Sequence, residues 1–155
     1  MLFLPQLQAS ALLLCASTAL SQTIVSNPES ACESVATSFV SENVTINFAH
    51  YVPAGTNLTL EQGYDLASCT RPFQLVPVDI CRVAMFVKTS STSNITLEAW
   101  LPTKNWTGRF LSTGNGGLSG CIQYEDLAYT AGLGFATVGA NNGSANSPFR
   151  NMHGI

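Results

Sequence analysis

Charged residues are scarce in this sequence. Only 10% of its 155 residues are charged, and 6 basic against 9 acidic residues give a net charge of −3. A protein that binds nucleic acid neutralises phosphates with clustered Lys and Arg, and the sequence has no such cluster, so nucleic acid is not an expected partner. The hydrophobic share of 46% is enough for a core, which excludes a disordered chain and favours one folded domain.

The sequence also lacks the residue spacings of a metal site and of a serine-hydrolase centre. No two cysteines have the C-x-x-C spacing, and neither His50 nor His153 lies near a cysteine, so no metal site is predicted. No G-x-S-x-G motif occurs, because the segment 117–121 ends in Cys121 where the motif needs Gly. His153 has no acidic residue after Asp126 to orient it. We therefore predict no catalytic residue in this chain.

No apolar run is long enough to cross a membrane. The run Ala11–Ala16 near the N-terminus is short, and the small residues Ala19 and Ser21 follow it. This pattern predicts a secretory signal peptide over residues 1–21, with cleavage before Gln22. We therefore expect a secreted, extracellular protein whose mature part has no membrane span.

Secretion changes the interpretation of the cysteines. Cys15 would leave with the signal peptide, so four of the 5 cysteines remain. An even number of cysteines in an oxidising compartment predicts two disulfides, and the sequence alone leaves three pairings open. The four residues are Cys32, Cys69, Cys81 and Cys121.

N-x-S/T sequons point to the same compartment. So many in a short chain exceed what chance comfortably explains, and they predict glycosylated asparagines at the surface. The sequons begin at Asn43, Asn57, Asn94, Asn105 and Asn142.

The first half of the mature chain predicts one helix and one strand. A capping asparagine, a proline at the first helical position and an acidic first turn predict a helix over residues 28–37. Val44, Ile46 and Phe48 alternate with other residues up to position 49, which predicts a half-buried strand. Residues 60–75 show no clear period, and we predict an irregular segment there.

The second half predicts a hairpin followed by a strand–helix–strand unit. Two apolar runs, 81–88 and 95–101, are joined by a polar turn. An apolar lead-in then enters a glycine-rich stretch, followed by a helix over 124–131 and a strand over 135–139. Antiparallel strands followed by one parallel crossover predict an α/β fold. A single crossover leaves too few elements to cover a parallel sheet, so we expect the sheet to be incomplete.

The glycine-rich stretch contains Gly114, Gly116, Gly117 and Gly120 between the expected strand and helix. Residues without a Cβ let the backbone come unusually close to another group. Backbone N–H groups could there bind an anionic or oxyanionic group, or the glycines could form a tight structural turn. The residues alone leave both interpretations open.

Several blocks of residues, in this order, carry a family resemblance. They are the YVPAG turn within 43–55, CRVA at 81–84, WLP at 100–102, WTGRFL at 106–111, GNGGLSGCI at 114–122 and LGFAT at 133–137. Together they resemble the N-terminal part of the fungal tannase and feruloyl esterase family, and the resemblance covers nearly the whole mature chain.

The resemblance implies an α/β-hydrolase fold and serine-type hydrolysis of phenolic-acid esters, with a small phenolic ester as the substrate. The family's nucleophile lies in a C-S-x-G-G elbow that this sequence lacks, and its Asp and His are also absent. We therefore expect residues 22–155 to be a partial domain without nucleophile elbow or lid, inactive as this short chain. No cofactor is expected, because the family's calcium site belongs to the lid.

The resemblance also implies roles for particular residues. Gly116 and Gly117 match the loop that supplies one oxyanion-hole N–H in α/β-hydrolases. The implied disulfides are Cys32–Cys81 and Cys69–Cys121. Trp100 and Trp106 are interpreted as core or sheet-face aromatics. Residues 144–155 depart from the family, with Ser144 where many relatives continue with His.

A different class of function remains open at this stage. The chain could be a non-catalytic secreted glycoprotein that binds carbohydrate or protein through a face of Trp106, Tyr124 and Tyr129. A nucleotide-binding module is disfavoured, because Ser119 stands where a dinucleotide fingerprint needs its third Gly.

Overall fold

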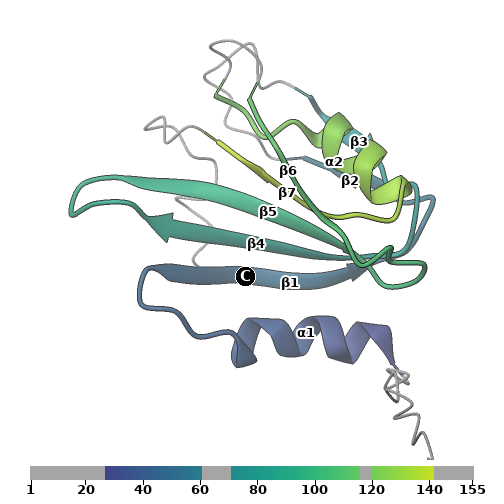
Figure 1. Cartoon of the computed structure of the whole chain (residues 1–155), viewed down its shortest axis with the longest axis horizontal. Helices are drawn as coiled ribbons and strands as arrows, with labels where there is room; N and C mark the ends of the chain where they lie inside the picture. The colour runs from purple at the N-terminus through teal and green to yellow at the C-terminus, as the bar shows by residue number, and fades with distance from the viewer. Residues whose placement is uncertain (1–26, 61–70, 116–119, 142–155) are drawn as a thin grey trace, which may run out of the picture.

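A mixed five-stranded sheet organises the chain (Figure 1). The structure is a computed structural model that describes residues 27–60, 71–115 and 120–141. The strand order in the main sheet is β1-β4-β5-β7-β6, and β2 and β3 form a separate two-stranded sheet. The elements in chain order are α1 (Pro28–Ser38), β1 (Val44–Val52), β2 (Asn57–Thr59), β3 (Phe73–Leu75), β4 (Ile80–Lys88), β5 (Asn94–Pro102), β6 (Phe110–Thr113), α2 (Tyr124–Gly132) and β7 (Ala136–Ala140).

The expected hairpin and strand–helix–strand unit are both confirmed. β4 and β5 pair antiparallel over their whole length, and the polar segment between them is the hairpin turn. β6 and β7 pair parallel, and α2 makes the crossover between them. β7 also pairs antiparallel with β5, so it lies between the hairpin and β6. The sheet is therefore antiparallel on one side and parallel at the β6 edge.

The start of α1 follows from its first three residues. The Asn27 side chain accepts hydrogen bonds from the N–H groups of Glu29 and Ser30, at 3.0 and 3.4 Å. These bonds satisfy backbone donors that have no partner within the helix. Pro28 occupies the first turn without the loss of a hydrogen bond. The predicted helix is confirmed, and its end lies one residue beyond the expected one.

A β-bulge corrects the predicted pattern of β1. The register against β4 shifts between Ile46 and Phe48, so Asn47 is an extra residue with no directly paired partner. Ile46 and Ala49 therefore face one side of the sheet, and Phe48 faces the other. The expectation that Val44, Ile46 and Phe48 share one buried face is wrong at Phe48, because a bulge reverses the alternation beyond it.

The segment 60–75 is also not irregular throughout. Phe73–Leu75 forms β3, which pairs antiparallel with β2. The N–H of Gly55 donates to Val76 O at 2.8 Å, and the N–H of Val76 donates to Thr56 O at 2.9 Å, so the pairing continues beyond the strands. The pairing supplies the backbone hydrogen bonds that apolar periodicity did not predict. Residues 61–70 lie outside the described part of the chain.

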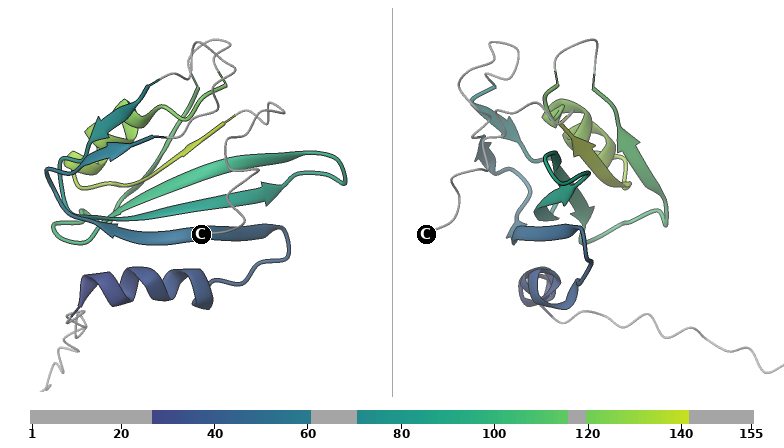
Figure 2. Two further views of the ribbon diagram at one scale, coloured as in Figure 1. Left: turned by 180° about the vertical axis from the view of Figure 1, so that it is seen from behind. Right: turned by 90° about the vertical axis from the view of Figure 1, so that its left-hand side faces the viewer.

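Both faces of the main sheet are covered over part of their area (Figure 2). On one face α1 lies along β1, and the buried residues there include Cys32, Ala49, Cys81 and Val83. On the other face α2 and the β2–β3 pair pack over the sheet. Their shared core contains Val52, Leu60, Val76, Ile80, Trp100, Ile122, Tyr124, Leu127, Ala128 and Ala131.

One of the two implied disulfides is confirmed. Cys32 on α1 and Cys81 on β4 are bonded, with their Cα atoms 5.4 Å apart. Cys121 is disulfide-bonded as well. Cys69 lies outside the described residues, so the Cys69–Cys121 pair stays a prediction. The confirmed bond fixes α1 to the sheet at a strand that is itself central to the fold.

The described residues contain no helix that is both long and apolar enough to cross a membrane. Residues 1–26 lie outside the described part, so the signal peptide over 1–21 stays a prediction.

Removal of the Cys32–Cys81 bond should lower the free energy of unfolding. The bond joins residues 49 apart in sequence. A closed loop of that length corresponds to about 4 kcal/mol in the chain-entropy model, so Cys32→Ser with Cys81→Ser should lose about 2–4 kcal/mol. Urea denaturation of the secreted protein measures the loss. Thr37→Ala, on the exposed side of the same helix, is the control and should change the stability by less than about 1 kcal/mol. A double variant as stable as the parent would contradict the prediction.

Candidate functional site

The glycine-rich stretch connects the end of β6 to the start of α2. Residues 116–119 lie outside the described part of the chain, and with them Gly116 and Gly117, so their oxyanion-hole role stays a prediction. The two ends of the stretch are described. Asn115 Nδ2 donates to Cys121 O at 3.0 Å, which holds the two ends together across the undescribed residues. The described residues on either side of this gap, Asn115 and Cys121, are thus in direct contact.

A close approach between sheet and loop explains one further glycine. A Cβ at Gly139 on β7 would lie 3.1 Å from Thr113 Oγ1 and 3.2 Å from Ile122 Cγ2. Thr113 ends β6, and Ile122 lies just before α2. Thr113 Oγ1 also donates to Val138 O at 3.2 Å. A side chain at position 139 would therefore require Thr113 and Ile122 to give way by a few tenths of an ångström.

A buried carboxylate lies beside the loop's C-terminal end. Glu98 on β5 is fully buried and accepts four hydrogen bonds. Arg82 on β4 donates Nε–H to Oε2 at 2.7 Å and Nη2–H to Oε1 at 2.5 Å. Trp100 donates its indole N–H to Oε2 at 3.1 Å. The Tyr124 hydroxyl donates to Oε1 at 2.6 Å. Both carboxylate oxygens are satisfied, which is what the burial of a charge requires.

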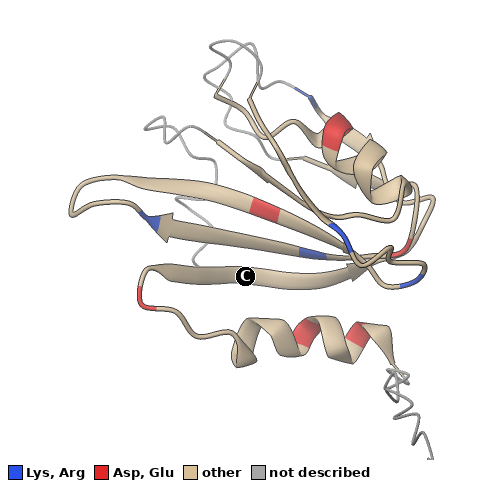
Figure 3. Ribbon diagram, viewed as in Figure 1, with Lys and Arg blue, Asp and Glu red and all other residues tan. Residues whose placement is uncertain are grey.

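The electrostatics of this cluster follow from burial and charge. Burial would lower the pKa of the Arg82 guanidinium, but the carboxylate of Glu98 more than offsets it, and the pKa lies above its ordinary value. Burial and then the negative charge of Glu98 raise the pKa of Tyr124 well above 10.0. Few other residues of the described sheet are charged (Figure 3). Arg82 and Glu98 therefore have few alternative charged partners. Tyr124 therefore stays a neutral donor at all physiological pH values.

The cluster matters for the loop because Tyr124 is the first residue of α2. Its hydroxyl donates a hydrogen bond to Glu98 on the sheet. The centroids of its ring and of the Trp100 ring lie 6.2 Å apart. The Gln123 side chain makes no capping hydrogen bond at the start of α2. The tyrosine therefore anchors the point at which the glycine-rich loop ends.

Sequence reasoning missed this cluster. Thr96 and Glu98 alternate with apolar residues in β5, a pattern typical of a strand with one polar, solvated face. Both residues are instead fully buried, because α2 covers this face. A signal for the ion pair was present in the sequence. The acidic residue of β5 is Glu98, and Arg82 lies diagonally opposite it on β4, within reach of a long side chain.

The two tryptophans lie in different environments. Trp100 is buried in the core as expected. Trp106 is 58% exposed and lies outside the strands, so its interpretation as a core or sheet-face aromatic is wrong. Its indole N–H donates to Arg109 O at 3.0 Å. It lies in the loop between β5 and β6, beyond the packed part of the sheet.

The alternative binding face is contradicted by the burial of its central residue. Tyr124 is only 2% exposed, whereas Tyr129 on the same helix is 69% exposed. Trp106, Tyr124 and Tyr129 therefore do not form one surface. Tyr124 has a structural partner in Glu98 instead of a role in carbohydrate binding.

The described residues bring no serine and histidine together. Ser112 lies on β6 and His50 on β1, and these strands form opposite edges of the sheet. The His50 ring stacks on Phe48 with centroids 4.9 Å apart, and Arg82 lies over the same phenylalanine. His153, Ser119 and Ser144 lie outside the described part. The same part contains no group of three metal-ligating side chains.

The sequon asparagines in the described part are at the surface, as expected. Asn43, Asn57, Asn94 and Asn105 are all exposed, and Asn142 lies outside the described residues. Their glycosylation stays a prediction.

No family model matches the sequence. Individual proteins do match it strongly. It is 69% identical over 101 residues to a probable feruloyl esterase B-2 of Neosartorya fischeri. The aligned residues are 65% of this chain and 19% of that protein. It is also 64% identical over 115 residues to a probable feruloyl esterase B-2 of Aspergillus terreus, and these residues are 74% of this chain and 21% of that protein. The chain is a relative of the fungal feruloyl esterases. The resemblance deduced from the sequence blocks is thereby confirmed.

Solved structures of such esterases have the same fold over the aligned part. An esterase from Aspergillus oryzae matches with a TM-score of 0.70 and 59% identity, over 77% of this chain and 23% of that one. Feruloyl esterase B from A. oryzae matches with a TM-score of 0.63 and 48% identity, over 74% of this chain and 22% of that one. This chain thus spans about a fifth of the length of the curated feruloyl esterases that it matches.

Replacement of Tyr124 by Phe should destabilise the protein and reduce its sensitivity to alkali. Loss of a hydrogen bond to a buried charge costs about 2 kcal/mol at pH 7. Because the folded-state pKa of Tyr124 is raised, its contribution is complete below the unfolded pKa of 10.0 and is lost as the pH rises above that value. Above that pH, ionisation of this tyrosine should lower the free energy of unfolding of the parent protein by up to about 1.4 kcal/mol per pH unit. The free energy of unfolding of Tyr124→Phe should fall less steeply. Urea denaturation at pH 7 to 11 measures both effects.

Tyr129→Phe is the matched control, since it makes the same change on the exposed side of α2. It should change the stability at pH 7 by less than about 0.5 kcal/mol. Equal behaviour of the two variants would show that the bond to Glu98 does not stabilise the fold.

Proposed function

We propose that this chain is part of a secreted carboxylic ester hydrolase that cleaves phenolic-acid esters, as the names of its feruloyl esterase relatives suggest. The observation that carries the proposal is an identity of 69% over 101 residues with one such protein, together with a TM-score of 0.70 to an esterase structure. Secretion is proposed from the leader-like residues 1–21 and from the sequons. The substrate is a small ester of a phenolic acid.

In this proposal the described elements are the N-terminal part of an α/β-hydrolase sheet. The unit β6–loop–α2–β7 has the form of the segment that carries the first oxyanion-hole N–H in such enzymes. Gly116 and Gly117 would aim backbone N–H groups at the oxyanion of the tetrahedral intermediate, where donors at about 3 Å stabilise the developing charge. The second N–H would come from the residue after the nucleophile.

The reaction proposed for the whole enzyme is acyl transfer through a serine ester. A serine attacks the ester carbonyl, a histidine takes its proton and passes it to the leaving alcohol, and water then releases the acid. These 155 residues contain neither a G-x-S-x-G nor a C-S-x-G-G motif. The chain would contribute the oxyanion loop and its support to that reaction, but not the nucleophile. No cofactor is needed for these steps.

The chain alone should not hydrolyse esters. Loss of triad members costs many powers of ten in rate even where an oxyanion hole remains, and here half of the hole is also missing. Residues 22–155 should therefore convert methyl ferulate, methyl gallate and nitrophenyl acetate no faster than the Gly117→Val variant. Turnover above background that this substitution abolishes would mean that Ser112, Ser119 or Ser144 acts as a nucleophile.

A graft tests the positive part of the proposal. Residues 27–141 should replace the corresponding segment of A. oryzae feruloyl esterase B with hydrolysis of methyl ferulate retained to within about tenfold, since 48% of the aligned residues are identical. Gly117→Val in the graft should lower kcat by about a hundredfold or more, as loss of an oxyanion donor does. Gly108→Val, at a left-handed glycine outside the glycine-rich stretch, is the control for general destabilisation by a Gly→Val change. A folded graft without activity, or one that Gly117→Val leaves unchanged, would refute the role of the loop.

A further inference from the structure

The outer face of the β2–β3 pair has two exposed apolar side chains. Phe73 is 54% exposed and Leu75 is 57% exposed. Residues two apart in a strand share a face, so these two side chains form one apolar patch on β3. Leu58 and Val76 lie on the other face of the pair and pack into the core. An exposed apolar patch is a candidate contact surface, and the residues beside it indicate what can cover it.

The register of the pair places a sequon on this same outer face. Asn57 lies directly opposite Leu75, and Thr59, the hydroxyl residue of the sequon, lies directly opposite Phe73. Opposite residues of an antiparallel pair point to the same side, with Cβ atoms about 5 Å apart, and diagonal neighbours stay within reach of long or aromatic groups. Asn57 is exposed, as a glycosylated asparagine must be. A sugar on Asn57 would therefore begin beside Leu75 and within reach of Phe73.

Hydrogen bonds beyond both ends of the two strands fix this register. Val76 makes its backbone hydrogen bonds with residues 55 and 56 beyond one end. Beyond the other end, the N–H of Leu60 donates to Pro72 O at 3.0 Å. A slip of one residue would turn Asn57 to the core face, and these bonds oppose it. Because the backbone is already ordered, the entropy cost of holding a sugar on the patch is lowered.

We propose that Asn57 is N-glycosylated and that its first N-acetylglucosamine packs on the apolar patch of Phe73 and Leu75. The substituents of that sugar lie around the rim of its ring, so both ring faces present C–H groups. Such C–H groups are attracted to the negative face of an aromatic ring, while the hydroxyl groups at the rim stay in water. The inference rests on secretion of the chain, which is part of the proposed function.

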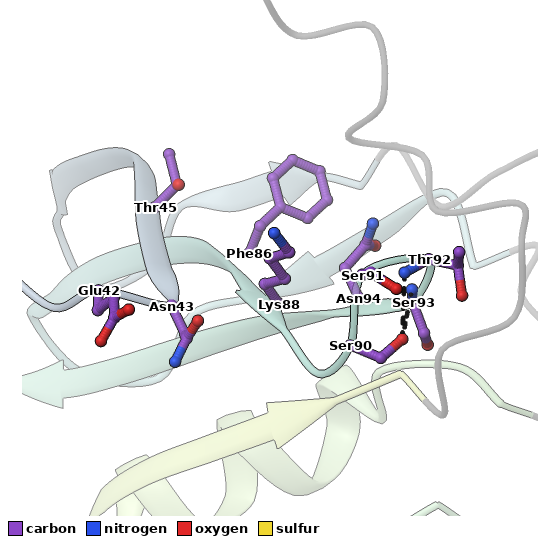
Figure 4. A pocket seen from close by; sticks show the side chains of 10 residues that line it. All are labelled: Glu42, Asn43, Thr45, Phe86, Lys88, Ser90, Ser91, Thr92, Ser93 and Asn94. Carbon is purple, nitrogen blue, oxygen red and sulfur yellow. Dashed lines mark hydrogen bonds between the residues drawn. The ribbon is translucent and has the colours of Figure 1, made fainter.

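Two other sequon asparagines have different surroundings. Asn43 and Asn94 both line one hollow at the hairpin end of the sheet, and its lining residues other than Phe86 are polar or charged (Figure 4). Asn43 precedes β1 and Asn57 follows it, and a strand of nine residues is about 30 Å long. A change in the apolar patch should therefore leave glycans at the hairpin end unaffected.

Site-resolved deglycosylation of the full chain, secreted from a yeast host, tests the proposal. An endoglycosidase that cuts between the first two N-acetylglucosamines needs access around the first sugar, so contact with the patch should slow it. Replacement of both Phe73 and Leu75 by Thr, which suits a strand, should speed cleavage at Asn57 about tenfold, which corresponds to about 1.4 kcal/mol. The rates at Asn43 and Asn94 should not change. Mass spectrometry of the glycopeptides over time gives all three rates.

Two further variants separate the sugar contact from other effects. Phe73→Tyr keeps the ring and should preserve the slow cleavage at Asn57. Val40→Thr changes an apolar residue that is 90% exposed between α1 and β1, and should leave the rate at Asn57 equal to that of the parent. Urea denaturation verifies that each variant is folded.

Several results would overturn the proposal. One is a rate at Asn57 that the double Thr substitution leaves unchanged in a folded protein. Another is an unoccupied Asn57 beside an occupied Asn43 and Asn94, which would leave secretion and the proposed function intact. A dimeric parent protein with Asn57 unoccupied would assign the patch to a second copy of the chain instead. A protein without a glycan at any sequon would contradict secretion as well.

Discussion

The burial of the Glu98 carboxylate is the constraint on which the rest of this structure depends. A charge removed from water costs several kcal/mol unless other groups replace its hydration. Arg82, Trp100 and Tyr124 together provide four hydrogen bonds, and they come from both hairpin strands and from α2. No two of these elements can shift against each other without the loss of a donor. The ion pair therefore determines where α2 sits on the sheet.

The position of α2 in turn determines the geometry of the glycine-rich loop. The loop leaves β6 at Thr113 and must reach Tyr124, whose place is set by Glu98. Gly139 provides the space that lets both ends approach the sheet, and the Asn115 amide joins them. On the opposite face, the Cys32–Cys81 bond holds α1 independently of this arrangement. One face is thus fixed by a covalent bond, and the face that carries the loop is fixed by a polar network.

Local signals in the sequence predicted the elements well, and long-range pairing explains the errors. Asn27 and Pro28 act within one helical turn, so the start of α1 could be predicted. The hairpin and the crossover followed from alternation and from glycine placement. The bulge at Asn47 could not be predicted, because it depends on the fit of β1 against β4. The pairing of β3 with β2 and the burial of Glu98 depend likewise on what covers each surface. For the site, the loop was located from its glycines, but its anchor was not.

The strand order also implies an order of folding during synthesis. β1, β4 and β5 are neighbours in the sheet, so their pairing can form once the ribosome has released the hairpin. β6 emerges next, but its described neighbour is β7, which the ribosome makes after α2. β7 must therefore insert between β5, which is already paired with β4, and β6, which was synthesised earlier. Glu98 would meet Arg82 and Trp100 first and gain Tyr124 only when α2 arrives, so the parallel half of the sheet is completed last.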